Sequence, residues 1–91
     1  MIHITKVFNI LRNKHRFNIY KLIMDEPGIG QGEIARKFKR RITQGMLSII
    51  LSDMVEVGLI DRAREKTRNS YDIGNKAVEG GVKYFLHMLN K

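Results

Sequence analysis

The sequence predicts a single, mainly α-helical domain with one small β-hairpin, and three observations lead to this fold class. Apolar residues recur every three or four positions from Ile4 to Met24, which is the period of an α-helix. Two further helical segments follow closely, over 31–38 and 43–57. Two short strand-like segments, 59–64 and 70–73, then flank a polar, basic stretch that is typical of a hairpin tip.

The N-terminal part of the chain is expected to contain three helices. The first two meet near residues 13–14, and Pro27 ends the second because proline interrupts helical hydrogen bonding. The short third helix carries Glu33 in its first turn, where the helix dipole favours a carboxylate. A turn with at most one short strand pair around Ile29 precedes it and contains Gly28, Gly30 and Gly32. This spacing lacks a preceding strand and a Gly-Lys-Ser/Thr sequence, so it favours a plain turn over a phosphate-binding loop.

The fourth helix, over 43–57, has a start signal and a stop signal. The hydroxyl of Thr43 is a good N-cap because it can accept a hydrogen bond from the first helical turn. Gly58 is a typical residue at which a helix ends. Apolar residues at helical spacing form one stripe that is expected to pack on the core, consisting of Leu47, Ile50, Leu51 and Met54.

The hairpin and one last helix complete the chain. The segment 65–69 forms the basic tip of the hairpin, and the last helix begins at Asn75 and extends to about Asn90. The resulting order, α-α-α-α-β-β-α, is that of a winged helix-turn-helix, whose hairpin is called the wing. No repeat or linker interrupts the 91 residues, so residues 1–91 are expected to form one domain.

The stretch from Ile42 to Ile60 resembles the recognition-helix region of two regulator families, the arsenic-repressor-like and multiple-antibiotic-repressor-like proteins. In those families an apolar residue, a small hydroxyl residue and glutamine open the helix, and an acidic residue, a small residue, glycine, leucine and an aliphatic residue close it. This chain has Ile42, Thr43 and Gln44, then Leu47, Ser48, Leu51 and Met54, then Glu56, Val57, Gly58, Leu59 and Ile60. Upstream, Glu33, Ile34 and Ala35 stand where these families commonly have Glu-Leu-Ala. The resemblance covers nearly the whole chain and implies a transcriptional regulator that binds double-stranded DNA.

The polar face of the 43–57 helix carries groups that can contact base edges in the major groove. Glutamine can pair with adenine N6 and N7, serine can bond to several base acceptors, and a glycine permits close approach of the backbone. Ile49 has two interpretations, contact with a thymine methyl group or extension of the core stripe beside Ile50, and core packing is favoured. The candidate base contacts are Gln44, Gly45, Ser48 and Ile49.

Positive charge is concentrated immediately before this helix. The chain has 17 Lys and Arg against nine Asp and Glu, and its formal net charge of +8 favours a polyanionic partner. No acidic residue occurs between Arg36 and Ser52. A basic block in this turn is expected to contact phosphates, adding affinity and salt dependence more than sequence preference, with Arg40 and Arg41 the strongest candidates. The candidate phosphate contacts are Lys37, Lys39, Arg40, Arg41, Thr43 and Ser52.

The wing is the second basic element. Strand alternation places the side chains of Arg62 and Arg64 on one face, whereas Lys66 and Arg68 are expected at or near the tip. The tip is expected to reach a minor groove, where arginine senses groove width more than base identity. The predicted wing contacts fall within 62–70, and the alternative is a hairpin that only faces solvent.

The last helix, about 75–91, is expected to form a homodimer interface. The chain has no cysteine and therefore no disulfide, and so small a core gains stability from an apolar surface shared with a second subunit. The resemblance also implies pairing through the terminal helices, and an isologous contact would cover their apolar stripe. Packing within one chain is the alternative for any single residue. The candidates are Phe8, Leu11, Val78, Val82, Phe85, Leu86 and Leu89.

Several classes of function are not expected. The three histidines show no i,i+4 partnering and cysteine is absent, so neither a transition-metal site nor a cofactor is expected. The sequence offers no activated nucleophile or paired carboxylates near a histidine, so it does not predict an enzyme. The segment 1–14 mixes basic and apolar residues without a signal-like apolar run, and we expect a cytoplasmic protein that does not contact a membrane.

The leading hypothesis is a dimeric regulator that places two 43–57 helices in successive major grooves, about 34 Å apart, on a palindromic site. Two alternatives stay open. One is an architectural or replication-associated DNA binder with little sequence preference. The other is a winged-helix protein-interaction module in a transcription complex, whose basic surface would contact an acidic protein.

Overall fold

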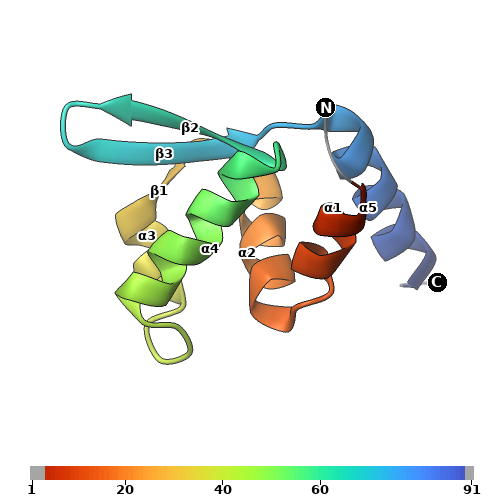
Figure 1. Cartoon of the computed structure of the whole chain (residues 1–91), viewed down its shortest axis with the longest axis horizontal. Helices are drawn as coiled ribbons and strands as arrows, with labels where there is room; N and C mark the ends of the chain where they lie inside the picture. Colours follow the sequence, from red (N-terminus) through yellow and green to blue (C-terminus); the bar gives the residue numbers. More distant parts are fainter. Residues whose placement is uncertain (1–3, 90–91) are drawn as a thin grey trace.

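The computed structural model describes residues 4–89, and within them five helices accompany a three-stranded sheet, with α2, α3 and α4 packed against the sheet and α1 and α5 further from it (Figure 1). The sheet is antiparallel, in the order β1-β3-β2, so the short β1 pairs with β3, the second strand of the hairpin. The mainly α-helical class with a small hairpin is therefore confirmed. In chain order the elements are α1 (Ile4–Leu11), α2 (Lys14–Asp25), β1 (Ile29–Gly30), α3 (Gln31–Lys37), α4 (Gln44–Glu56), β2 (Ile60–Glu65), β3 (Arg68–Ile73) and α5 (Lys76–Leu89).

Both predicted ends of α4 are confirmed by their hydrogen bonds. The Thr43 hydroxyl accepts a bond of 3.1 Å from the backbone N–H of Met46, as an N-cap does. At the other end Gly58 has φ +84°, a left-handed conformation that costs glycine little. The backbone N–H of Leu59 then bonds to the carbonyl of Met54 at 2.9 Å, which closes the last turn in a Schellman arrangement.

The hairpin strands are longer than the sequence predicted. Pairing continues outward to Glu65 opposite Arg68, so only Lys66 and Thr67 form the turn, where a tip over 65–69 was expected. Lys66 takes a positive φ of 55° to make this tight turn. The sequence did not predict this two-residue turn because Lys-Thr is not a typical turn sequence, whereas Asn-Gly, which readily adopts positive φ, would have indicated one.

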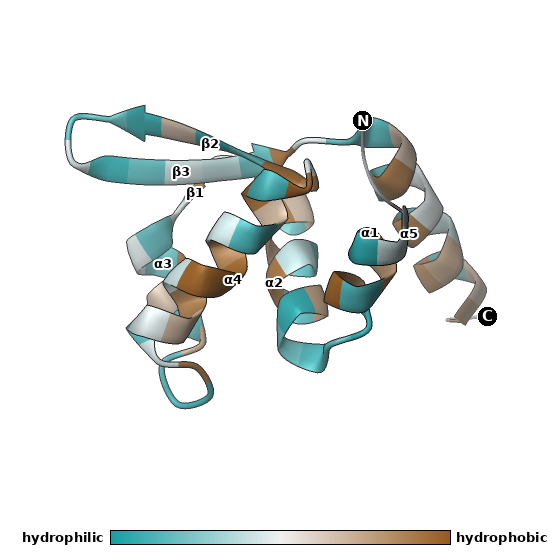
Figure 2. Ribbon diagram, viewed as in Figure 1, coloured by the Kyte–Doolittle hydropathy of each residue, from teal (hydrophilic) through white to brown (hydrophobic). Residues whose placement is uncertain are grey.

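The core lies between the sheet and the helices α2, α3 and α4. Its fully buried side chains include two tyrosines, Tyr20 of α2 and Tyr71 of β3. By contrast, none of the described residues of α5 is buried, and this helix lies beside α1 at the side of the molecule away from α3 (Figure 1). Figure 2 shows hydrophilic residues along the hairpin and apolar residues along much of α5.

Tyr20 makes the stability of the fold sensitive to alkaline pH. Its hydroxyl has no hydrogen-bond partner among the described residues, and burial, followed by the nearby Glu79 carboxylate, raises the pKa of Tyr20 to about 12. This pKa lies above the ordinary value of 10.0, so the folded state favours the neutral hydroxyl of Tyr20. The contribution of Tyr20 to the free energy of unfolding is therefore complete below pH 10 and is lost as the pH rises toward 12. At about 1.4 kcal/mol per pKa unit, we expect the free energy of unfolding to fall by up to about 3 kcal/mol across this window.

The variant Tyr20→Phe isolates this contribution, since it keeps the buried ring and removes the ionisable hydroxyl. We expect the alkaline loss to be smaller in the variant, and its stability at neutral pH to be equal to or above that of the wild type, because an unpaired buried hydroxyl is costly. Urea unfolding of both proteins at about pH 9 and about pH 11 measures the difference. Equal losses in the two proteins would assign the alkaline transition to other groups.

Candidate nucleic-acid interface

Helix α4 turns one face to the core and the opposite face to solvent. The predicted core stripe is confirmed, because Leu47, Ile50, Leu51 and Met54 are each at most 4% exposed. The predicted base contacts Gln44, Gly45, Ser48 and Ile49 are all exposed, and so is Ser52. A side chain added at Gly45 would meet nothing within 4 Å, so the backbone there is open to an approaching surface.

The favoured core interpretation of Ile49 is wrong. Its side chain is 61% exposed, whereas its neighbour Ile50 is 4% exposed. At about 100° per residue, Ile49 lies about 40° from Gly45 and about 60° from Ser52 around the helix axis, on the outward face. The other interpretation, an apolar group presented to a partner, agrees with this position.

Ser48 and Ser52 lie on the edge of this face that is turned toward α3 and the hairpin. The Ser48 hydroxyl accepts a hydrogen bond of 3.1 Å from Nε2 of Gln31, the first residue of α3. The Ser52 hydroxyl accepts one of 3.1 Å from Nη2 of Arg62 in β2. These bonds connect the exposed face of α4 to the two neighbouring elements.

Gln31 and Tyr71 belong to this site, although the sequence analysis did not select them. The buried Tyr71 hydroxyl donates to Oε1 of Gln31 at 2.8 Å and accepts from Nε of Arg62 at 3.2 Å. The Arg62 guanidinium also lies over the Tyr71 ring, 5.6 Å from its centroid. Strand alternation with Ile73 could have placed Tyr71 on the inner face, but no signal in the sequence marked Gln31.

The basic turn before α4 gathers as predicted. Five side chains from the end of α3 and the turn surround one surface hollow of about 240 Å³, namely Arg36, Lys37, Lys39, Arg40 and Arg41. Lys37 differs from the rest, because its Nζ lies 3.6 Å from Oε2 of Glu26. Arg40 and Arg41 are exposed beside the N-terminal end of α4, next to the cap residue Thr43.

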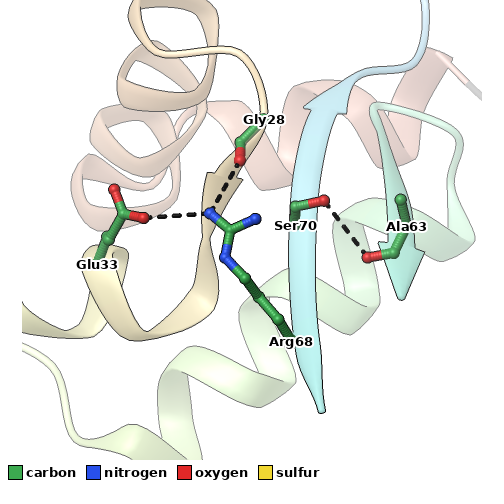
Figure 3. Close-up of polar contacts among 5 residues, drawn as sticks. All are labelled: Gly28, Glu33, Ala63, Arg68 and Ser70. Carbon is green, nitrogen blue, oxygen red and sulfur yellow. Dashed lines mark hydrogen bonds and ion pairs between the residues drawn. The ribbon is translucent and has the colours of Figure 1, made fainter. Parts of the chain in front are cut away.

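Arg68 directly follows the tip turn, near the tip as predicted, but its side chain is held within the fold. Its Nη2 lies 3.2 Å from Oε1 of Glu33 and 3.4 Å from the carbonyl oxygen of Gly28, so the side chain crosses β1 and contacts α3 (Figure 3). A Cβ at Gly30 would come within 3.0 Å of the guanidinium, and glycine therefore leaves it room. Of the four basic residues predicted for the wing, Lys66 alone lies in the tip turn. Arg64 is exposed on β2, and Arg62 lies further from the tip, where it donates a hydrogen bond to Ser52.

An apolar groove of about 530 Å³ lies between α1 and α5 on another side of the molecule. Among the predicted interface residues, Phe8, Phe85 and Leu89 are 66%, 61% and 64% exposed. The other four, Leu11, Val78, Val82 and Leu86, are half-buried, and all but Leu86 pack against the core of their own chain. Tyr84 and Met88 add further exposed apolar surface to α5.

Residues 4–89 contain neither a metal-ligand cluster nor a membrane-spanning helix. No group of three or more His, Asp or Glu side chains is placed there to hold a metal ion. None of the helices in that range combines the length and the apolar character that crossing a membrane requires.

Comparison with known proteins supports the fold. No protein-family model matches the sequence, and no curated sequence relative is found. Among solved structures the chain is similar to HlyU from Vibrio cholerae N16961, with a TM-score of 0.82 and 17% sequence identity. The match covers 96% of this chain and 91% of HlyU. The winged-helix fold is therefore shown, with β2 and β3 as its hairpin.

Proposed function

We propose that this protein is a sequence-specific transcriptional regulator that binds double-stranded DNA with α4 in the major groove. One observation carries the proposal, namely an exposed face of α4 that begins directly after a cluster of exposed basic side chains. The basic cluster suits the phosphate backbone, and the short side chains after it suit the width of the groove. Such a regulator would act in the cytoplasm.

The groups on the outward face of α4 differ in what they offer to DNA. The Gln44 amide can pair with adenine, and the open backbone at Gly45 allows close approach to base edges. Ile49 offers an apolar contact for a thymine methyl group at the centre of the face. Ser48 completes the proposed base contacts.

Backbone contacts are assigned to the residues around this face. Arg40 and Arg41 contact phosphates at the N-terminal end of α4, supported by Lys39, Thr43 and Ser52, while Lys37 contributes if it leaves Glu26. In the wing, Arg64 and Lys66 are the residues placed to approach a minor groove. Arg62 and Arg68 have partners within the fold, so we assign them to holding the wing against α4 and α3.

The apolar groove between α1 and α5 is assigned to a homodimer. Phe8, Phe85 and Leu89 expose large apolar side chains that an isologous partner would cover. A two-fold axis through this interface would present two copies of α4 to successive major grooves of a palindromic site.

Selection of binding sites from a random pool of DNA duplexes tests the proposed function. We expect an enriched palindromic motif and an affinity for it at least about a thousandfold above that for unrelated duplexes. Binding with a flat sequence profile would support the architectural DNA binder instead. Absence of binding even at low salt would favour the protein-interaction module.

Replacing Ile49 by alanine tests the central contact of α4. We expect Ile49→Ala to weaken the preference for thymine at one position of each half-site by roughly fivefold to tenfold, because the methyl contact is lost. Met46→Ala is the matched control, since Met46 is 52% exposed on the same helix, one turn earlier, and lies about 60° around the axis from Ile49, at the edge of the outward face. Base preferences measured by competition anisotropy should change more in the first variant than in the second.

A further inference from the structure

A chain of hydrogen bonds connects the wing to the outward face of α4 through α3. It runs through five side chains from four elements. Nη2 of Arg62 donates to Ser52 at 3.1 Å, and Nε of Arg62 donates to the Tyr71 hydroxyl at 3.2 Å. Tyr71 donates to Oε1 of Gln31 at 2.8 Å, and Nε2 of Gln31 donates to Ser48 at 3.1 Å.

The direction of this chain is fixed by chemistry. A guanidinium has only donors, so the Tyr71 oxygen must accept from Arg62. Tyr71 is fully buried, and its single proton needs an acceptor because an unsatisfied buried hydroxyl is costly. The oxygen of the Gln31 amide lies in bonding distance of that proton, so Gln31 turns its Oε1 to Tyr71 and its NH₂ group to Ser48.

This direction determines which hydrogen bonds the Ser48 hydroxyl can still make. Its oxygen accepts from Gln31, and no hydrogen bond donated by the Ser48 hydroxyl occurs among the residues that the structure describes. Ser48 is exposed on α4, so its one proton is available to a ligand that approaches this face. A serine hydroxyl has one proton and two lone pairs. The bond from Gln31 occupies one lone pair while the proton stays free, which shifts Ser48 toward donating.

We propose that Arg62, Tyr71 and Gln31 set the polarity of Ser48, so that it donates to a base and selects an acceptor in the major groove. This inference rests on the proposed function, in which α4 contacts bases. The matching edges are N7 and O6 of guanine, N7 of adenine and O4 of thymine, whereas the amino groups N4 of cytosine and N6 of adenine are disfavoured. Tyr71 and Gln31 are positioning residues and need not touch the DNA.

The variant Gln31→Glu reverses the polarity and is the decisive test. A carboxylate only accepts, so it would bond to both the Tyr71 and the Ser48 hydroxyls and leave Ser48 with lone pairs toward the DNA. Folding is expected to tolerate the change, since Gln31 is the first residue of α3 and a carboxylate is favoured in the first turn. At one half-site position we expect the preference to move from an acceptor edge to a donor edge by roughly fivefold to tenfold, the size of one hydrogen bond.

Two companion variants make the test specific. In Ser48→Ala the same position should lose its preference, and adding Gln31→Glu to it should change nothing further there. In Tyr71→Phe the Gln31 amide loses its orienting partner, so we expect a flattened preference together with a shift of the Gln31 side-chain NH₂ signals in the NMR spectrum of the free protein. Base ratios at each position, rather than total affinity, are compared, because the added charge of Glu lowers binding to every sequence.

The outcomes separate this inference from the proposed function. Failure of the wild type to bind DNA would overturn the proposed function and the inference with it. A wild type with a clear motif whose base ratios do not change in Gln31→Glu would overturn the inference alone. A change in those ratios that persists in the Ser48→Ala background would also overturn it, since the effect would not pass through Ser48.

Discussion

Replacing both Arg40 and Arg41 by alanine is expected to weaken binding to all DNA duplexes by about tenfold to a hundredfold at moderate salt. Both arginines are exposed in the turn that leads into α4 and line the same surface hollow, where the proposed function has them contact phosphates. Each lost phosphate contact should also flatten the plot of log K against log salt by nearly 0.9. The order of preference among sequences should remain, because phosphate contacts carry little sequence information.

Fluorescence anisotropy over a series of salt concentrations measures both quantities. The matched control is Lys76→Ala with Lys83→Ala, which removes the same charge from α5, where each lysine lies within 3.6 Å of Glu79. If binding depended only on net charge, the two double variants would weaken it equally. A salt slope that does not change in the arginine variant would contradict the assignment of these residues to phosphates.

Features that depend on nearby residues could be predicted from the sequence. The ends of α4 follow from the Thr43 hydroxyl and the left-handed Gly58, both of which act within one turn of the chain. The buried stripe of α4 follows from helical spacing alone. The gathering of the basic turn could be predicted for the same reason, since its five side chains are neighbours in sequence.

Features that depend on contacts between distant segments could not be predicted from the sequence. Arg68 contacts Glu33, 35 residues away, and Tyr71 contacts Gln31, 40 residues away, so composition gives no indication of either pair. The exposure of Ile49, by contrast, could have been predicted. An isoleucine is usually buried, but at about 100° per residue Ile49 lies nearly opposite the core stripe of α4, and it is exposed.

Helix α5 shows what the sequence can and cannot say about an interface. Its apolar spacing predicted a buried stripe, and the structure places Val78 and Val82 partly against the core of their own chain. One part of the apolar stripe therefore packs within the chain and the other part is exposed. Helical spacing alone cannot tell which residues belong to which part. The exposed part, with Phe85 and Leu89, is what a second copy would have to cover.

Phe85→Glu is expected to convert the proposed dimer to monomer. The variant removes a large apolar side chain from the groove between α1 and α5 and places a charge there, and an isologous interface contains this change twice. At about 1.5 to 3 kcal/mol for each lost apolar side chain, the dissociation constant of the dimer should rise by at least about a hundredfold. Folding should persist, because Phe85 is 61% exposed and no described residue of α5 is buried.

Sedimentation equilibrium, with binding to a full palindrome and to a single half-site, separates dimerisation from DNA contact. Phe85→Glu should lose much of its affinity for the palindrome and keep its affinity for the half-site, because each α4 is untouched while the two copies no longer bind together. Tyr84→Glu is the matched control, since Tyr84 is 67% exposed on the same helix but about 100° away from Phe85, off the stripe. Equal dissociation in both variants would mean that charge on α5, and not the groove, governs association. A wild type that is monomeric at micromolar concentration and binds half-sites singly would remove the dimer from the proposed mechanism and leave the contacts of α4 in place.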